Sequence, residues 1–210
     1  MSYPLLHWAV ASRALRGELV SGDGHLVHDS AGGVLVAVVD GLGHGPDAVV
    51  AATRALDTVA AYAREPLVPL LQHCHEQLQG TRGVVMSVAC FRRDRAVMSW
   101  IGVGDVEAVL VRGGSHHKPV RESLPLRGGV IGYQLPPLRE STLPVTAGDP
   151  LILATDGIRP DFVEDAELAN PLLRRTLDGP QQIADAIIAR YAKDTDDALV
   201  LVVRYEGAVP

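Results

Sequence analysis

Four aspartates in this sequence lie where apolar strands are expected to begin or end. Asp40 and Asp156 each close an apolar run, and each is followed directly by glycine. Asp23 lies in the glycine turn SGDG, and Asp196 belongs to the Asp-Asp pair that precedes the last apolar run. Since strand edges in a sandwich can converge on one end, we predict that these carboxylates share one pocket.

Carboxylates gathered in one pocket need something to offset their repulsion. Two unit charges about 4 Å apart repel by about 4 kcal/mol at an effective dielectric of about 20, and desolvation adds to this cost. Either protons are taken up or a cation neutralises the charge. Oxygen ligands favour Mg²⁺ or Mn²⁺, and two such ions roughly 3.5–4 Å apart can activate a water for attack on a phosphoryl group. The pattern therefore indicates a two-metal site for phosphoryl chemistry.

Each aspartate also has an ordinary structural interpretation. An Asp-Gly pair after a strand is usually only a turn, and the pair Asp196-Asp197 can simply solvate the start of a strand. The metal interpretation rests on the whole set, in this order and with apolar strands leading in or out. The glycines after Asp40 and Asp156 fit it, because they remove side chains that would block a metal, a water or a backbone carbonyl ligand.

Hydrophobic patterning predicts the elements that position these residues. Strands are expected over residues 5–15, 24–28 and 34–39, then a helix that begins near Pro46 and a second helix over 67–78. Three strands in an antiparallel meander are expected over 83–91, 96–104 and 106–114. After an irregular loop over 124–144 come a strand over 150–157, short helices over 171–177 and 181–192, and a strand over 198–205. This order indicates an α+β fold with antiparallel sheets and helices outside.

Composition narrows the class of protein. The chain has 210 residues, which suits one domain over 1–210, and 47% of them are hydrophobic, enough for a substantial core. Asp and Glu number 25 against 19 Lys and Arg, a net charge of -6, which argues against a nucleic-acid-binding surface. No stretch approaches the roughly 18 apolar residues of a membrane span, and the N-terminus lacks a basic leader. We therefore expect a cytoplasmic protein that binds neither nucleic acid nor membrane.

The acidic motifs resemble those of the metal-dependent protein phosphatase (PPM) family, in its compact bacterial branch related to SpoIIE. The matching motifs are SGD at 21–23, DGLGHG at 40–45, GVGD at 102–105, TDG at 155–157 and DD at 196–197. They extend over essentially the whole chain, and DGLGHG followed by an Ala/Val-rich helix is the most specific. With no sensor or kinase-like segment attached, the chain is most similar to RsbX-type phosphatases, which remove phosphate from Ser or Thr in the STAS domains of stressosome proteins.

The resemblance implies a fold, two metal ions and a role for each acidic residue. The fold would be an α-β-β-α sandwich of two antiparallel sheets flanked by helices, with a dinuclear Mn²⁺ or Mg²⁺ site. Asp40 would bridge the two ions. Gly41 would offer its carbonyl to one ion, with Asp23 nearby, and Asp156 and Asp196 would hold the other. The implied partners are phosphorylated STAS-domain proteins.

His44 is the candidate general acid. Eukaryotic relatives carry a histidine directly after the Asp-Gly pair, whereas this chain has Leu42 there and its histidine two residues further on. His44 would protonate the leaving seryl oxygen, a role that water can also serve. Many relatives carry Thr or Ser three residues after the final metal aspartate; here Leu199 implies that a supporting hydrogen bond is missing. Asp105, where some relatives bind a third ion, is expected to serve a turn.

Two other classes of function stay open. Gly41, Gly43 and Gly45 follow a strand and precede a helix, as in a nucleotide-binding module, but the spacing is GxGxG and no Lys-Ser/Thr pair follows. The other class is a catalytically silent scaffold that binds a phosphoprotein without turnover. Four intact ligand candidates argue against the scaffold.

Overall fold

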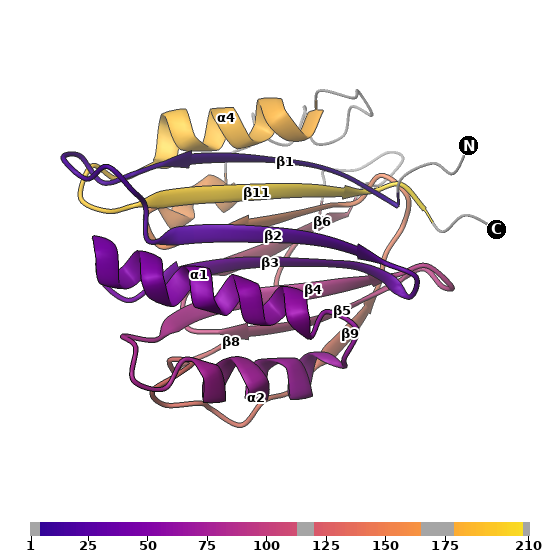
Figure 1. Cartoon of the computed structure of the whole chain (residues 1–210). Helices are drawn as coiled ribbons and strands as arrows, with labels where there is room; N and C mark the ends of the chain where they lie inside the picture. Colours follow the sequence, from indigo (N-terminus) through magenta and orange to yellow (C-terminus); the bar gives the residue numbers. More distant parts are fainter. Residues whose placement is uncertain (1–4, 113–119, 165–178, 208–210) are drawn as a thin grey trace.

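The computed structural model describes residues 5–112, 120–164 and 179–207 as two β-sheets packed face to face between helices (Figure 1). Helices α1 (Pro46–Ala61) and α2 (Leu67–Gln77) cover the outer face of one sheet, and α4 (Gly179–Tyr191) covers the outer face of the other. A short 3-10 helix, η1 (Pro160–Glu164), packs beside α4. The layers are α-β-β-α, so the predicted fold class is confirmed.

The strand order of each sheet follows from mostly antiparallel pairing. One sheet has the order β1-β11-β10-β6-β7, formed by Leu6–Arg13, Ala198–Tyr205, Pro150–Ala154, Glu107–Arg112 and Val120–Ser123. The other has the order β2-β3-β4-β5-β8, formed by Asp23–Ser30, Gly33–Gly41, Val84–Arg92, Val97–Val103 and Leu126–Arg127, with β9 (Ser141–Pro144) also paired to β5. Among the described strands, β5 and β8 form the one parallel pair. Antiparallel pairing sets the end of one strand beside the start of its neighbour, which gathers distant residues at the sheet edges.

Three apolar layers hold the sandwich together. The layer between the sheets contains the largest buried rings, including Trp100 and the stacked pair Phe91 and Tyr205. A second layer lies under α1 and α2, and a third lies under α4. Strand β11 is buried along its whole length, which explains its apolar run from Ala198 to Val203. Within the described ranges, no helix is long and apolar enough to cross a membrane.

Two sequence expectations about the strands need correction. The third strand of the predicted meander, β6, pairs with β10 in the other sheet and not with β5. The chain changes sheets at Gly104, whose φ is +93° and where a Cβ would lie 2.2 Å from a methyl of Val85. Apolar alternation does not distinguish the two sheets, so the pattern could not reveal this crossing. The loop expected over 124–144 contains the edge strands β8 and β9, and the helix expected over 171–177 lies outside the described residues.

The glycines that follow Asp40 and Asp156 have a packing role that the sequence analysis did not assign. A Cβ on Gly41 would lie 2.2 Å from the carbonyl oxygen of Ala48 in α1. A Cβ on Gly157 would lie 1.7 Å from the carbonyl oxygen of Asp197. Both glycines thus permit close approach of two backbone segments, which fixes the aspartates before them.

Replacing Gly157 with alanine is expected to lower the free energy of unfolding by about 3 kcal/mol, because the added methyl meets a backbone carbonyl that cannot rotate away. Gly32→Ala is the matched control, since nothing lies within 4 Å of its Cβ position, and its effect should stay within about 0.5 kcal/mol. Urea denaturation of the wild type and the two variants measures both changes in the free energy of unfolding. Equal stability of the two variants would contradict the packing role.

Candidate metal centre

The four predicted aspartates come together at one end of the two sheets. Asp23 and Asp40 are cross-strand neighbours on β2 and β3. Asp156 follows β10 and Asp196 precedes β11, and these two strands pair in the other sheet. A cavity of about 560 Å³ is lined by Asp40, Asp156 and Asp196. Three of the four predicted aspartates thus line one cavity and Asp23 lies beside it; that they bind metal stays a prediction.

Burial and mutual repulsion both act on these carboxyl groups. Burial, followed by the charges of Asp23 and Asp156, raises the pKa of Asp40 to about 9. Burial also raises the pKa of Asp23 to about 7, although a hydrogen bond from Thr155 opposes the shift. Burial and then the charge of Asp196 raise the pKa of Asp156. The pocket thus retains protons in the place where a cation would relieve the repulsion.

The donor set fits a hard divalent cation that keeps part of its water shell. Among the described residues, no three acidic, histidine or cysteine side chains already stand in an arrangement that could hold an ion. Mg²⁺ usually keeps several waters and uses one or two carboxylates instead of a complete protein cage. An open cavity lined by Asp40, Asp156 and Asp196 suits such an ion. The raised pKa values of Asp23 and Asp40 also favour a cation here, because a nearby positive charge would stabilise the ionised form of both carboxyl groups.

Gly41 and Asp23 lie beside the cavity and not in its lining. The amide of Gly41 donates to the carbonyl of Gly22 at 3.1 Å, which fixes the backbone next to Asp40. The hydroxyl of Thr155 donates to Oδ2 of Asp23 at 2.8 Å, which orients that carboxylate. Their roles as metal ligands stay predictions.

The hydroxyl of Thr155 links Asp23 to the backbone of Leu199, while the hydrogen bond expected to be missing at the Leu199 side chain stays a prediction. Oγ1 of Thr155 donates to Asp23 and accepts from the backbone amide of Leu199 at 2.9 Å. The residue belongs to the TDG motif, so the sequence singled it out without giving it a role. The sequence could not reveal the contact between Thr155 and Asp23, because the two residues are 132 positions apart.

Asp197 holds the β1–β2 loop, while its neighbour Asp196 lines the cavity. The buried carboxylate of Asp197 accepts hydrogen bonds from the amides of Leu15 and Gly22, each at 2.7 Å. Both ends of the loop are therefore tied to one carboxylate. The two aspartates therefore have different roles: Asp196 belongs to the acidic cluster, and Asp197 supports the adjoining loop.

Asp105 and Lys193 also belong to the site, and the sequence analysis missed both roles. Asp105 lines the cavity, and after burial its charge is among those that raise the pKa of Asp40 and of Asp156. Lys193 donates from Nζ to the backbone carbonyl of Asp156, and its charge opposes the rise in that residue's pKa. The turn role expected for Asp105 is therefore incomplete, since the turn aims its carboxylate into the cluster.

His44 lines the same cavity from the DGLGHG loop. Gly43 and Gly45 have φ values of +83° and +79°, which L side chains rarely adopt, so the loop needs glycine at both places. Nδ1 of His44 lies 3.2 Å from Oε1 of Glu18, on the β1–β2 loop. The ring is therefore at the rim of the acidic cluster, with one nitrogen already engaged.

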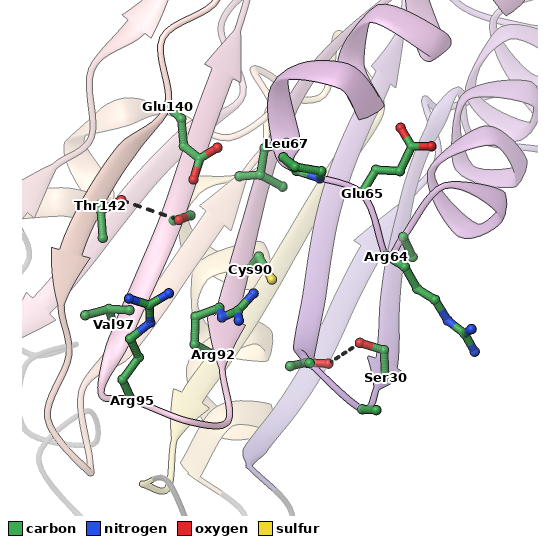
Figure 2. Close-up of a pocket in the computed structure, with 16 residues that line it drawn as sticks. Ser30, Arg64, Glu65, Leu67, Cys90, Arg92, Arg95, Val97, Glu140 and Thr142 are labelled. Carbon is green, nitrogen blue, oxygen red and sulfur yellow. Dashed lines mark hydrogen bonds between the residues drawn. The ribbon is translucent and has the colours of Figure 1, made fainter.

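A second cavity of about 550 Å³ lies at the opposite end of the same sheet (Figure 2). Gly33 at the start of β3 lines it, whereas Asp40 near the end of β3 lines the acidic cavity. Seven residues of strand separate these positions by about 23 Å. Figure 2 shows Arg92, Arg95 and Glu140 around this second cavity, and none of the predicted site residues lines it.

Comparison with known proteins agrees with this geometry. Residues 30–206 match the family described as stage II sporulation protein E (SpoIIE). The chain belongs to the SpoIIE family. Its class, a phosphoprotein phosphatase of the PPM family, is as the sequence predicted. Dependence on Mn²⁺ or Mg²⁺ is typical of that family.

Three relatives illustrate the similarity of this SpoIIE-family phosphatase to known proteins. The phosphoserine phosphatase RsbX of Bacillus subtilis (strain 168) is 28% identical over 152 residues, which span 70% of this chain and 72% of RsbX. A solved structure from a study of the bacterial stressosome as a modular system controlling secondary messenger signalling is 30% identical, with a TM-score of 0.83 over 95% of this chain and 99% of that one. RsbX in complex with magnesium has a TM-score of 0.79 at 19% identity, covers 98% of both chains, and shows the shared fold.

Without metal, the stability of the protein should fall as pH rises. The folded state keeps protons on Asp23 and Asp40 up to pKa values of about 7 and about 9, whereas the unfolded chain releases them near the ordinary value of 3.8. The unfolded state thus binds fewer protons across this range, so the free energy of unfolding decreases with pH. Asp40→Asn should raise the metal-free unfolding midpoint at about pH 8 by about 2–4 °C or more.

Calorimetry with and without Mn²⁺ at about pH 5 and about pH 8 measures this effect. Mn²⁺ should stabilise the wild type more at the higher pH, because binding releases protons, and Asp40→Asn should lose most of that gain. Asp57→Asn, on the exposed side of α1, is the matched control and should behave like the wild type. An Asp40→Asn protein that is less stable than the wild type at about pH 8 without metal contradicts the expectation.

Proposed function

We propose that this SpoIIE-family phosphatase removes phosphate from phosphoserine or phosphothreonine in a STAS-domain protein of a cytoplasmic, stressosome-type signalling complex, with two Mn²⁺ or Mg²⁺ ions. The observation that carries the proposal is the cavity lined by Asp40, Asp156 and Asp196, with Asp23 directly beside it. The likeness to RsbX and to a stressosome protein supports the signalling context.

The acidic residues would hold the ions. When bound, the ions would supply the Lewis acidity that activates water and stabilises charge on the phosphoryl oxygens. Asp40 would lie between them, Asp23 and the carbonyl of Gly41 would serve one, and Asp156 and Asp196 would serve the other. The two strand pairs that carry these residues belong to different sheets, which supports a division into two ion positions.

His44 would donate the proton that the leaving seryl or threonyl oxygen needs. Glu18 engages Nδ1 of the ring, so Nε2 is the nitrogen left for proton transfer. The same contact orients the imidazole ring. The general acid would therefore come from the rim of the cavity and the ions from its floor.

The two other classes of function have less support. Gly43 and Gly45 adopt the backbone conformation of phosphate-binding loops, but the cavity beside them is lined by aspartates, which repel a nucleotide phosphate unless a cation intervenes. A silent scaffold has no need to keep four buried or half-buried carboxylates together at a cost in stability. The arrangement favours turnover.

Release of phosphate from a phosphorylated STAS domain and from p-nitrophenyl phosphate should require Mn²⁺ or Mg²⁺. Asp40→Asn should lower kcat by about 100-fold or more, because both ion positions depend on this carboxylate. Asp57→Asn serves as the surface control and should keep full activity. Full activity of the wild type after exhaustive chelation would rule out the metal mechanism.

His44→Gln should slow hydrolysis of a phosphoserine peptide by about 100-fold while leaving p-nitrophenyl phosphate hydrolysis within about threefold. The reason is the leaving group: a seryl alkoxide needs a proton, whereas nitrophenolate leaves without one. Steady-state kinetics on the two substrates measure the difference. An equal loss on both would assign His44 to the structure of the loop and remove it from proton transfer.

A further inference from the structure

Two large apolar side chains are almost fully exposed on loops that contact or help to line the acidic cavity. Leu19 is 99% exposed and Tyr133 is 82% exposed, the highest values among the exposed large hydrophobic residues of the described chain. These two side chains expose apolar surface to water, and exposed apolar surface is typical of binding sites. Their position relative to the cavity decides what they bind.

Leu19 extends from a loop that is held in place. Asp197 accepts hydrogen bonds from the amides of Leu15 and Gly22 at the two ends of the loop. Between them, Glu18 contacts His44, which lines the cavity. Leu19 is therefore the neighbour of a residue that touches the rim, and its backbone is fixed on both sides.

Tyr133 extends from a turn that forms another part of the rim. Val130 lines the cavity, its amide donates to the carbonyl of Gln134 at 2.9 Å, and the amide of Tyr133 donates back to Val130 at 3.1 Å. The amide of Gly132 donates to Nδ1 of His75 in α2 at 3.0 Å, which anchors the turn. The two exposed side chains thus belong to separate, well-held loops that adjoin one cavity.

We propose that Leu19 and Tyr133 form a docking surface for the phosphoprotein substrate and bind apolar side chains that flank its phosphorylated residue. This inference rests on the proposed function. The phosphorylated side chain must enter the cavity of about 560 Å³, so the polypeptide on either side of it must lie against the rim. A small aryl phosphate has no polypeptide on either side of its phosphoryl group, so it would make no such contacts with these two residues.

The exposed side chains of Leu19 and Tyr133 indicate which substrates this surface would favour. The cavity recognises the phosphoryl group and discriminates little between phosphoproteins, because every one of them offers the same group. Apolar contacts outside the cavity add affinity only for substrates with apolar flanks. Since these contacts are the same before and during the reaction, they should act on KM and leave kcat unchanged.

A pair of phosphoserine peptides tests the proposal: one has leucines on both sides of the phosphoserine, and the other has serines there. The wild type should prefer the leucine peptide by about tenfold in kcat/KM, which is the effect of about 1.4 kcal/mol. Leu19→Ser and Tyr133→Ser should each raise KM for the leucine peptide and reduce the preference. Neither should change hydrolysis of p-nitrophenyl phosphate.

Conservative and distant variants complete the experiment. Leu19→Met and Tyr133→Phe should keep the preference, because they keep the apolar surface. Val120→Ser is the matched control: this exposed valine pairs with Arg112 at the far end of β6 from the cavity, and its loss should change nothing.

The possible results distinguish a failure of the docking surface from a failure of the proposed phosphatase function. A wild type that shows no preference between the peptides, or serine variants that retain it, overturns the docking surface while the phosphatase function stands. A parallel loss on the peptide and on p-nitrophenyl phosphate overturns it too, since the residues would then support the cavity itself. A wild type that hydrolyses neither peptide nor aryl phosphate with Mn²⁺ present rejects the proposed function.

Discussion

Carboxyl groups held close together inside the protein are the constraint on which the rest of this structure depends. Asp23 and Asp40 face each other across β2 and β3, and burial and neighbouring charge raise the pKa of both. Free in water, such groups would separate. The two sheets bring them together from distant parts of the chain, and only protons or a cation neutralise the result. The fold therefore holds a cluster of carboxyl groups whose negative charge must be neutralised by protons or by a bound cation.

Hydrogen bonds and close backbone contacts keep the carboxylates in place against their repulsion. Thr155 connects Asp23 to the start of β11, and Asp197 connects both ends of the β1–β2 loop to that same strand. Gly157 lets the turn after β10 approach the backbone of Asp197. These groups trade stability for a preorganised site, as is common where a protein must bind charge.

The proximity of the aspartates could be predicted from the sequence because the relevant signal is local, whereas their role as metal ligands stays a prediction. An apolar run that ends on an aspartate is visible within ten residues, and antiparallel pairing then places such ends together. The crossing of the chain at Gly104 to the second sheet was not visible, since either sheet accepts the same apolar alternation. The partners of Thr155 and Asp197 were also hidden. Their hydrogen bonds join residues 132 and 182 positions apart, and no local pattern encodes such pairs.

In the proposed function, different parts of the structure carry the reaction and the choice of substrate. The acidic residues sit at or next to strand ends, where sheet pairing and glycine contacts leave little freedom. Leu19 and Tyr133 sit on loops whose backbones are held by hydrogen bonds but whose side chains are almost fully exposed. A change in a loop side chain alters what reaches the cavity without moving an aspartate. A change at a strand end moves the charge cluster itself. On this proposal, substrate range can diverge among proteins of this fold while the chemistry stays fixed, because separate parts of the chain would set the two properties.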